Sequence, residues 1–174
     1  MTTLAPRTAD EVSDAIRWSL AAGEPLEVVS AGTRRVLGRP VEAPHVLDLS
    51  ALSGIVTYEP DELVLTALPG TPMDTLEAAL AEHSQCFAFE PPTLGVLLAG
   101  RGVTAAARIV NGTLGGVVAT GLSGPRRLKA GAVRDHVLGI GAVSGRAERF
   151  VGGGKVVKNV TGYDIPKLMT GSHG

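Results

Sequence analysis

The uneven placement of glycine constrains the fold of this chain most, because it divides the sequence into a glycine-poor first half and a glycine-rich second half. Most of the 23 glycines in the 174 residues lie beyond residue 94. Glycine weakens helices and strands and marks tight turns or close approaches of backbone. We therefore predict regular helices and strands in the first half and short, twisted strands with tight turns in the second. A linker is expected around 86–93, where two prolines interrupt the chain.

The first half begins with a predicted helix in TADEVSDAIRWSLAAG. Thr8 and Glu11 have the spacing of a capping box, and Gly23 is a typical helix end. The expected inward face consists of Val12, Ala15, Ile16 and Leu20.

Four strands and a second helix are expected to follow. The apolar runs at 26–30 and 45–50 predict two strands, and GIVTY and LVLTA predict an antiparallel hairpin because they flank the turn residues EPDE at 59–62. Thr71 is expected to cap the second helix, with Pro72 at its first position. Its expected inward residues are Leu76, Ala79 and Leu80.

In the second half, glycine steps separate apolar runs at 116–119, 137–143 and 156–157, which we interpret as antiparallel strands. The segment 102–110 is compatible with a helix or with a lid-like loop, and both remain open. Arg134 and Asp135 are expected to point to opposite faces of a strand because they are adjacent.

Composition excludes several functional classes. Sixteen basic residues against 17 acidic ones give a net charge of −1, so no overall basic field would recruit nucleic acid or an anionic membrane. A single cysteine excludes an intrachain disulfide and a cysteine-rich metal site, and the four histidines lack metal-ligand spacing. No export signal or membrane-spanning run is visible, so a cytoplasmic location is expected.

Two glycine-containing stretches and the closing segment are candidate binding sites. The loop from Ser30 to Arg34 follows a strand and lacks bulk, so its N–H groups could cradle phosphate oxygens; an unliganded turn is the alternative. In NGTLGGVVATGLSGPRR, Gly115 and Gly116 would let backbone approach a flat ligand, or serve only the twist of a hairpin. Tyr163 is either a core aromatic or part of a site with the neighbouring carboxylate.

Together these pieces resemble one family: FAD-binding domains of the vanillyl-alcohol oxidase/p-cresol methylhydroxylase type, and within it the FAD-binding (E-type) subunits of glycolate oxidase. Most specific are TGLSGPRR and, at a fixed distance after it, VVKNVTGYD. The other matching stretches, in chain order, are VVSAGTRRVLGRP, VLDLSALSGIVTYEPDELVLTALPGTPMDTLEAAL, FEPP and the region up to GSHG.

The resemblance implies an α+β fold of two subdomains with FAD between them. The first would be residues 1–88 with the pyrophosphate loop, and the second residues 89–174, mostly antiparallel β and incomplete. It implies non-covalent FAD, because the loop has no histidine, and it assigns no catalytic base. The implied FAD-binding residues are Ser30, Ala31, Gly32, Thr33, Arg34, Pro92, Thr113, Gly115, Gly116, Ser123, Gly124, Gly162, Tyr163 and Asp164.

The chain also departs from the family pattern. Ser30 and Ala31 stand where relatives usually have further glycines. The family sequence continues beyond GSHG into another strand and a substrate-side domain, so the resemblance predicts a chain truncated within the flavin cradle, through shortening, a premature stop or a degenerate copy.

Functionally, the resemblance implies a subunit of a glycolate oxidase-like 2-hydroxy-acid dehydrogenase. Flavin would accept a hydride, electrons would leave through an iron–sulfur subunit, and a second FAD-bearing subunit would complete the assembly. The assembly would not insert into the membrane and would be peripheral to the inner membrane only through its partners. The chain alone would be inactive. One alternative is a non-catalytic assembly subunit that keeps the fold without FAD; another is a flavin domain like the medium subunit of molybdenum hydroxylases.

Overall fold

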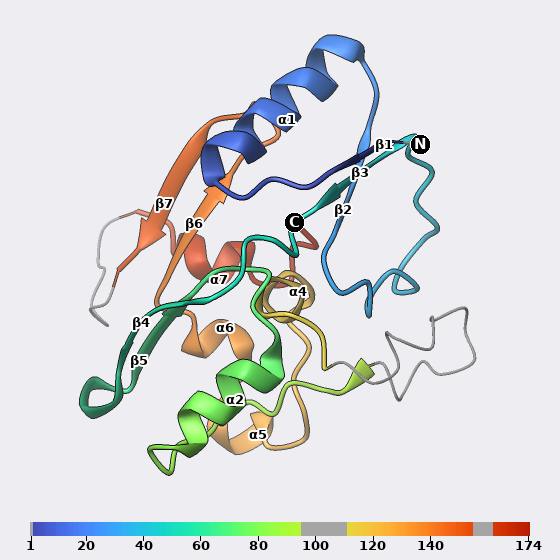
Figure 1. Ribbon diagram of the computed structural model, residues 1–174. Coiled ribbons are helices and arrows are strands. Elements are labelled where there is room, and N and C mark those ends of the chain that lie inside the picture. The colour runs from blue at the N-terminus through green and yellow to red at the C-terminus, as the bar shows by residue number, and fades with distance from the viewer. Residues whose placement is uncertain (1, 95–110, 155–161) are drawn as a thin grey trace.

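The computed structural model describes residues 2–94, 111–154 and 162–174 (Figure 1). The segment predicted as a helix or loop at 102–110 and the apolar run at 156–157 lie outside the described residues, as do Lys155 and Lys158. Among the described helices, none is both long enough and apolar enough to cross a membrane.

Helix α1 (Ala9–Ala22) confirms the first prediction. The Thr8 hydroxyl accepts a hydrogen bond from the Glu11 N–H at 3.2 Å, and Gly23 ends the helix in the left-handed region. The expected inward face is wrong at Leu20, which is 58% exposed. A 14-residue helix extends about 21 Å, whereas the four-residue strands beneath it extend only about 13 Å, so the last turn has no sheet to cover.

Three short strands form a parallel sheet in the order β1-β3-β2: β1 (Thr2–Leu4), β2 (Leu26–Val29) and β3 (His45–Asp48). The apolar core between this sheet and α1 contains Val12, Leu47 and Leu52. Strands β2 and β3 were expected. Strand β1 was not, because three residues are too few to show an alternating pattern.

The predicted hairpin is confirmed: β4 (Ile55–Glu59) pairs antiparallel with β5 (Val64–Ala67) through a 3-10 turn at Pro60–Glu62. Helix α2 (Met73–Ala81) follows, with Leu76 and Leu80 buried as expected. The predicted cap is wrong. Pro72 occupies the N-cap position, and the hydroxyl of Thr71 bonds to Gly54 and Leu68 instead.

The second half contains more helix than predicted. Its described helices are α4 (Leu114–Thr120), α5 (Arg127–Ala130), α6 (Val133–His136) and α7 (Ile165–Met169), and its strands are the antiparallel pair β6 (Gly139–Val143) and β7 (Arg149–Gly153).

Two predictions for this half are therefore wrong. The run 116–119 is helical because Thr113 caps its start and Gly121, at φ +61°, ends it after two turns. Arg134 and Asp135 do not oppose each other across a strand. They lie in the single turn of α6, with the guanidinium Nε 3.9 Å from the carboxylate.

One apolar core joins the two halves of the sequence. Met73 and Leu76 of α2 pack with Phe89, with Val117 of α4 and with Val133 of α6. The mixed helix and strand content confirms the α+β class, and the division at residue 88 stays a prediction.

Candidate functional site

The loop that follows β2 lies at the carboxyl edge of the parallel sheet. The end of β2 at Val29 pairs with Asp48, where β3 also ends. Ligands of sheets with parallel strands bind in the crevice outside this edge. Gly32 turns the chain at φ +69°, the N–H of Leu37 bonds to the carbonyl of Arg34 at 3.0 Å, and Thr33 is 3% exposed. The loop is therefore ordered by its own backbone.

Arg34 carries the principal charge of this loop into the protein. Its Nη1 donates to the Thr33 hydroxyl at 3.0 Å, whereas its Nε and Nη2 are buried without a hydrogen-bond partner among the described residues. The Ser30 hydroxyl is also buried and has no hydrogen-bond partner among the described residues. Burial lowers the pKa of the Arg34 guanidinium to about 10, so the group remains a cation at neutral pH.

The neighbouring Arg35 shows the contrasting environment. It is exposed, and its Nε donates to the Glu27 carboxylate at 2.7 Å, an interaction that raises the pKa of Arg35. Of two adjacent arginines, one already has its counter-anion and the other has none among the described residues. Arg34 is therefore the arginine of this pair that is available to bind an anion.

The start of α4 packs directly against this loop. A Cβ on Gly116 would lie 3.2 Å from Arg34 Nη1, so Gly116 lies against the loop, and its predicted approach to a flavin stays a prediction. Thr113 caps α4 by accepting from the Gly116 N–H at 3.4 Å. Gly115 packs within the protein: its N–H bonds to the Pro69 carbonyl at 2.8 Å, and an added Cβ would lie 2.8 Å from Pro69 Cβ. Its predicted approach to a flavin stays a prediction. Its small size is used for packing between chain segments.

Ser123 and Gly124 are also used within the protein. The Ser123 hydroxyl accepts from the Val133 N–H at 3.0 Å, and the Gly124 N–H bonds to the Phe89 and Glu90 carbonyls. A Cβ on Gly124 would lie 2.7 Å from Glu90 Cβ. These contacts fix the FEPP segment, whose Pro92 is half-buried and accepts from the Leu94 N–H at 3.0 Å.

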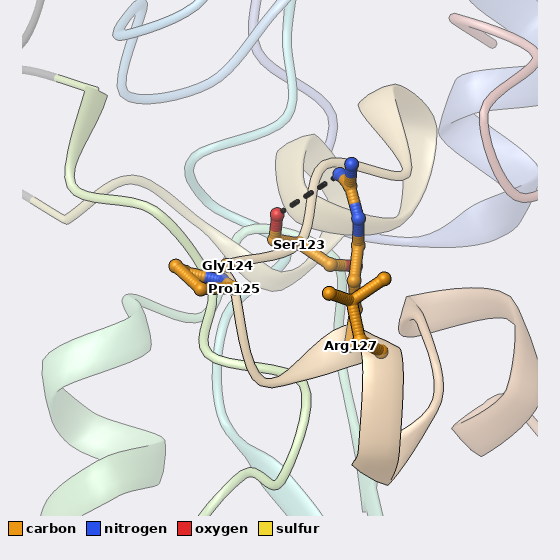
Figure 2. Close-up of a pocket in the computed structure, with 5 residues that line it drawn as sticks. Ser123, Gly124, Pro125 and Arg127 are labelled. Atoms are coloured by element: carbon orange, nitrogen blue, oxygen red, sulfur yellow. Dashed lines mark hydrogen bonds between the residues drawn. The ribbon is translucent and has the colours of Figure 1, made fainter.

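Figure 2 shows a shallow pocket beside these residues, lined by Ser123, Gly124, Pro125, Arg127 and Leu128. Arg127 Nη1 donates to the Ser123 carbonyl at 3.5 Å across it, and Leu128 is 92% exposed. Its volume of about 270 Å³ is below the range of about 300–1,000 Å³ that ligand pockets occupy. The pocket by itself does not accommodate a whole dinucleotide.

The closing segment runs along α4, where the Gly171 N–H bonds to the Val118 carbonyl at 2.9 Å and the His173 N–H bonds to the Ala119 carbonyl at 2.8 Å. Tyr163 is 81% exposed and is not a core aromatic. Asp164 caps α7, accepting from the Lys167 N–H at 3.2 Å and pairing with its ammonium at 2.9 Å, and these hydrogen bonds hold the pKa of the carboxyl below its usual range. Gly162, at φ +81°, precedes them in an exposed turn. Their predicted role beside a flavin ring stays a prediction.

Sequence reasoning missed Gly112, whose backbone leaves no room for a Cβ beside Arg34. A Cβ there would lie 2.2 Å from Arg34 Nη1. The residue has φ +84°, and the Asn111-Gly112 dipeptide is a usual signal for a turn with positive φ. That signal locates a turn but does not reveal which side chain packs on it.

These residues fit a ligand with a diphosphate. A buried, unpaired guanidinium and an unpaired hydroxyl lie in a loop at the carboxyl edge of a parallel sheet, where two phosphate groups would supply the missing acceptors. Ala31 and Gly32 add no side chain that would obstruct such a ligand.

A sequence model of the FAD binding domain family matches residues 2–103, more than half of the chain. The chain belongs to this family. FAD is accordingly the cofactor of this FAD-binding domain, and the expectation drawn from the resemblance is confirmed.

Curated relatives agree with this assignment. The domain is 41% identical over 159 residues to glycolate oxidase subunit GlcE of Escherichia coli (strain K12), which covers 91% of this chain and 41% of that protein. It is 28% identical to glycolate oxidase subunit GlcD of Bacillus subtilis (strain 168), covering 98% of this chain and 33% of that protein. The chain thus spans less than half the length of these relatives.

Solved structures show the same fold at low identity. Alkyldihydroxyacetonephosphate synthase superposes with a TM-score of 0.70 at 18% identity, covering 99% of this chain and 31% of the other. Aclacinomycin oxidoreductase superposes with a TM-score of 0.59 at 25% identity, covering 87% of this chain and 28% of the other.

Proposed function

We propose that this FAD-binding domain is part of a subunit of a glycolate oxidase-like 2-hydroxy-acid dehydrogenase. The observation that carries the proposal is the 41% identity to subunit GlcE over 91% of the chain. The unpaired guanidinium of Arg34 supports it, because a cation without a counter-anion is what a cofactor diphosphate requires.

Bound FAD would supply the hydride acceptor for oxidation of a small 2-hydroxy acid to the 2-oxo acid. The chain's own residues would bind and orient the cofactor. Arg34, Thr33 and Ser30 would hold its diphosphate, and the Gly116 end of α4 would border it. The cofactor would be held without a covalent link at this loop, because residues 30–34 include no histidine.

The remaining assembly is proposed on the same basis. A partner subunit with its own FAD would complete the enzyme, and an iron–sulfur subunit would take the two electrons. The assembly would be cytoplasmic and would meet the inner membrane only through its partners. A division into subdomains at residue 88 would place the cofactor between 1–88 and 89–174.

The test is a titration of the purified chain with FAD, following quenching of flavin fluorescence and the visible absorption spectrum. We expect saturation near one FAD per chain. Absence of binding by a chain that circular dichroism shows to be folded would contradict the proposal for this polypeptide.

A second candidate is a non-catalytic assembly subunit that keeps the fold without FAD. It is favoured by one observation: the space beside Gly115 is filled by Pro69, and the space beside Gly124 is filled by Glu90, so neither is open to a ligand on that side. Co-expression with partner subunits distinguishes the candidates. An assembly subunit would need its partner for solubility whether or not FAD is added, whereas the flavoprotein would gain solubility and thermal stability from FAD alone.

A further inference from the structure

Asn111 and Gly112 form the one asparagine–glycine step of the sequence. In such a step the backbone nitrogen of the glycine can reach the side-chain amide of the asparagine, because glycine has no Cβ to obstruct the approach. The other asparagine of the chain, Asn159, is followed by a valine, whose branched side chain hinders the same approach. The two asparagines therefore differ in their chemical reactivity.

The structure holds the amide of Asn111 but not the nitrogen that would attack it. Asn111 is half-buried, and its Nδ2 donates to Oδ1 of Asp74, the second residue of α2. Gly112 has φ +84° and lies outside any helix or strand, and its N–H donates to none of the described residues. The hydrogen bond to Asp74 is thus the contact that restrains the reacting group.

The step also lies where two helices are tied together. The Gly112 carbonyl accepts from the N–H of Met73, the first residue of α2, at 3.0 Å. Leu114, the first residue of α4, donates its N–H to the Thr71 carbonyl at 3.0 Å. We call these two backbone hydrogen bonds the helix junction. A change in the main chain at Asn111 and Gly112 would act on it directly.

The side chains that α2 presents to Asn111 are already negative. Asp74 accepts its amide, and Glu77 follows one turn later; loss of solvation and the charge of Asp74 raise the pKa of the Glu77 carboxyl. A carboxylate in place of the Asn111 amide would replace a hydrogen-bond donor to Asp74 by a like charge, which repels it. Such a change would weaken the helix junction.

We propose that Asn111 is a deamidation site of the folded chain, that Asp74 governs the rate, and that the new carboxylate weakens the helix junction. The Gly112 nitrogen forms a bond to Cγ of Asn111 while the Cγ–Nδ2 bond breaks. The proton of the Gly112 N–H passes through solvent to the departing nitrogen, which leaves as ammonia. The product of this first step is a cyclic imide.

Water then opens the imide at one of its two C–N bonds. One opening leaves the normal main chain and an aspartate; the other gives isoaspartate, in which the main chain runs through the former side-chain carbon. The whole reaction consumes one water and releases one ammonia, and nothing is oxidised or reduced. It requires no cofactor and is therefore independent of the proposed function.

Peptide mapping of the purified chain after incubation in neutral buffer tests the site. The tryptic peptide 109–126 contains Asn111 as its only asparagine, and mass spectrometry compares it with a sample digested at once. We expect conversion at Asn111, release of ammonia and a product that is methylated by an isoaspartate-specific methyltransferase, with Asn159 unchanged over the same time. In Asn111→Gln, whose longer side chain disfavours ring closure, the ammonia should be lost. No conversion at Asn111, or equal conversion at Asn159, would overturn the proposal.

Variants of Asp74 test the control of the rate. We expect Asp74→Ala to convert about twofold to tenfold faster, the factor that the net free energy of one hydrogen bond gives. Asp74→Asn keeps an oxygen that can accept and should retain the slow rate. Asp61→Ala removes a carboxylate from the exposed hairpin turn and should leave the rate unchanged. Equal rates in the parent and Asp74→Ala, or equal acceleration in Asp61→Ala, would contradict the role of Asp74. Circular dichroism establishes that each variant is folded.

The effect on the helix junction is measured with Asn111→Asp, which introduces the charge without incubation. We expect its midpoint of thermal unfolding to lie below that of Asn111→Ala, which removes the same hydrogen bond without adding charge. The difference should shrink as salt is added and vanish in the Asp74→Ala background. Equal midpoints for the two variants in both backgrounds would overturn the charge effect. These measurements use no flavin, so their outcome and that of the FAD titration are judged separately.

Discussion

At the scale of single residues, Thr71 illustrates how a side chain can hold two distant segments of backbone. It is fully buried, and its hydroxyl accepts from the Gly54 N–H at 2.9 Å and donates to the Leu68 carbonyl at 2.7 Å. The hydroxyl thereby connects the start of the hairpin to the end of β5.

Replacing Thr71 by valine keeps the shape of the side chain and removes both hydrogen bonds. We expect the free energy of unfolding to fall by about 1–3 kcal/mol, because the half-buried Gly54 N–H would lose this acceptor. Urea unfolding followed by circular dichroism measures the change. Thr75→Val is the control: Thr75 is exposed on α2, and the substitution should change stability by less than about 0.5 kcal/mol. Equal effects at both positions would contradict this role of the hydroxyl.

Residue-level predictions from sequence succeed where the partner is close in the chain. Thr8 caps α1 through Glu11, three residues away, and this spacing is visible in the sequence. Thr71 shows the opposite case: its partner Gly54 is 17 residues away, so the nearby helix start wrongly suggested a cap. The closeness of Gly112 to Arg34 is invisible for the same reason, because the two become neighbours only through the packing of α4 against the loop.

At the scale of elements, α2 carries the largest share of the core that joins the two halves. Leu76 has no exposed surface and packs with Phe89, Val117 and Val133. We expect Leu76→Ala to reduce the free energy of unfolding by about 2–5 kcal/mol through lost burial and the resulting cavity. Leu20→Ala on α1 is the matched control, since the same atoms are removed from a side chain that is 58% exposed. Its cost should stay below about 0.5 kcal/mol, and thermal melts of both variants check the difference.

A helix or strand can be predicted from sequence when its hydrophobic pattern is long and residues typical of caps or turns stand at both ends. Helix α1 has a cap, a periodic face and a terminal glycine, and the β4–β5 hairpin has two alternating runs around turn residues. Helix α4 has only seven residues, and its two adjacent valines favour a strand locally. Its helical state is decided by Thr113 at its start and by burial of Val117 in the shared core, which the local sequence does not reveal.

At the scale of the whole molecule, α1 and the β6–β7 pair join the beginning of the chain to its later part (Figure 1). Arg149 Nη1 lies 2.7 Å from an Asp10 carboxylate oxygen, and Val143 packs on the core cluster of Val12, Leu47 and Leu52. Both side chains of the ion pair are exposed, whereas Val143 is half-buried. Packing is therefore expected to contribute most of the attachment.

A double-mutant cycle of Asp10→Asn and Arg149→Gln measures the ion pair alone. We expect a coupling energy of about 0–1 kcal/mol that decreases as salt is added, because both side chains are solvated. Val143→Ala should cost more than either charge variant. A coupling energy well above this range, and insensitive to salt, would show that the ion pair holds the two parts together.

The order β1-β3-β2 has a consequence for how the chain acquires its structure. Strand β3 is central, yet it is the last of the three to be synthesised, and Thr2 pairs with His45 only after the 42 intervening residues are closed into a loop. Loop closure must precede the contacts that reward it, and parallel pairings of this kind form slowly. The hairpin β4–β5 needs no such closure. Folding is therefore expected to begin at the hairpin, with the residues of β1 among the last to take their place.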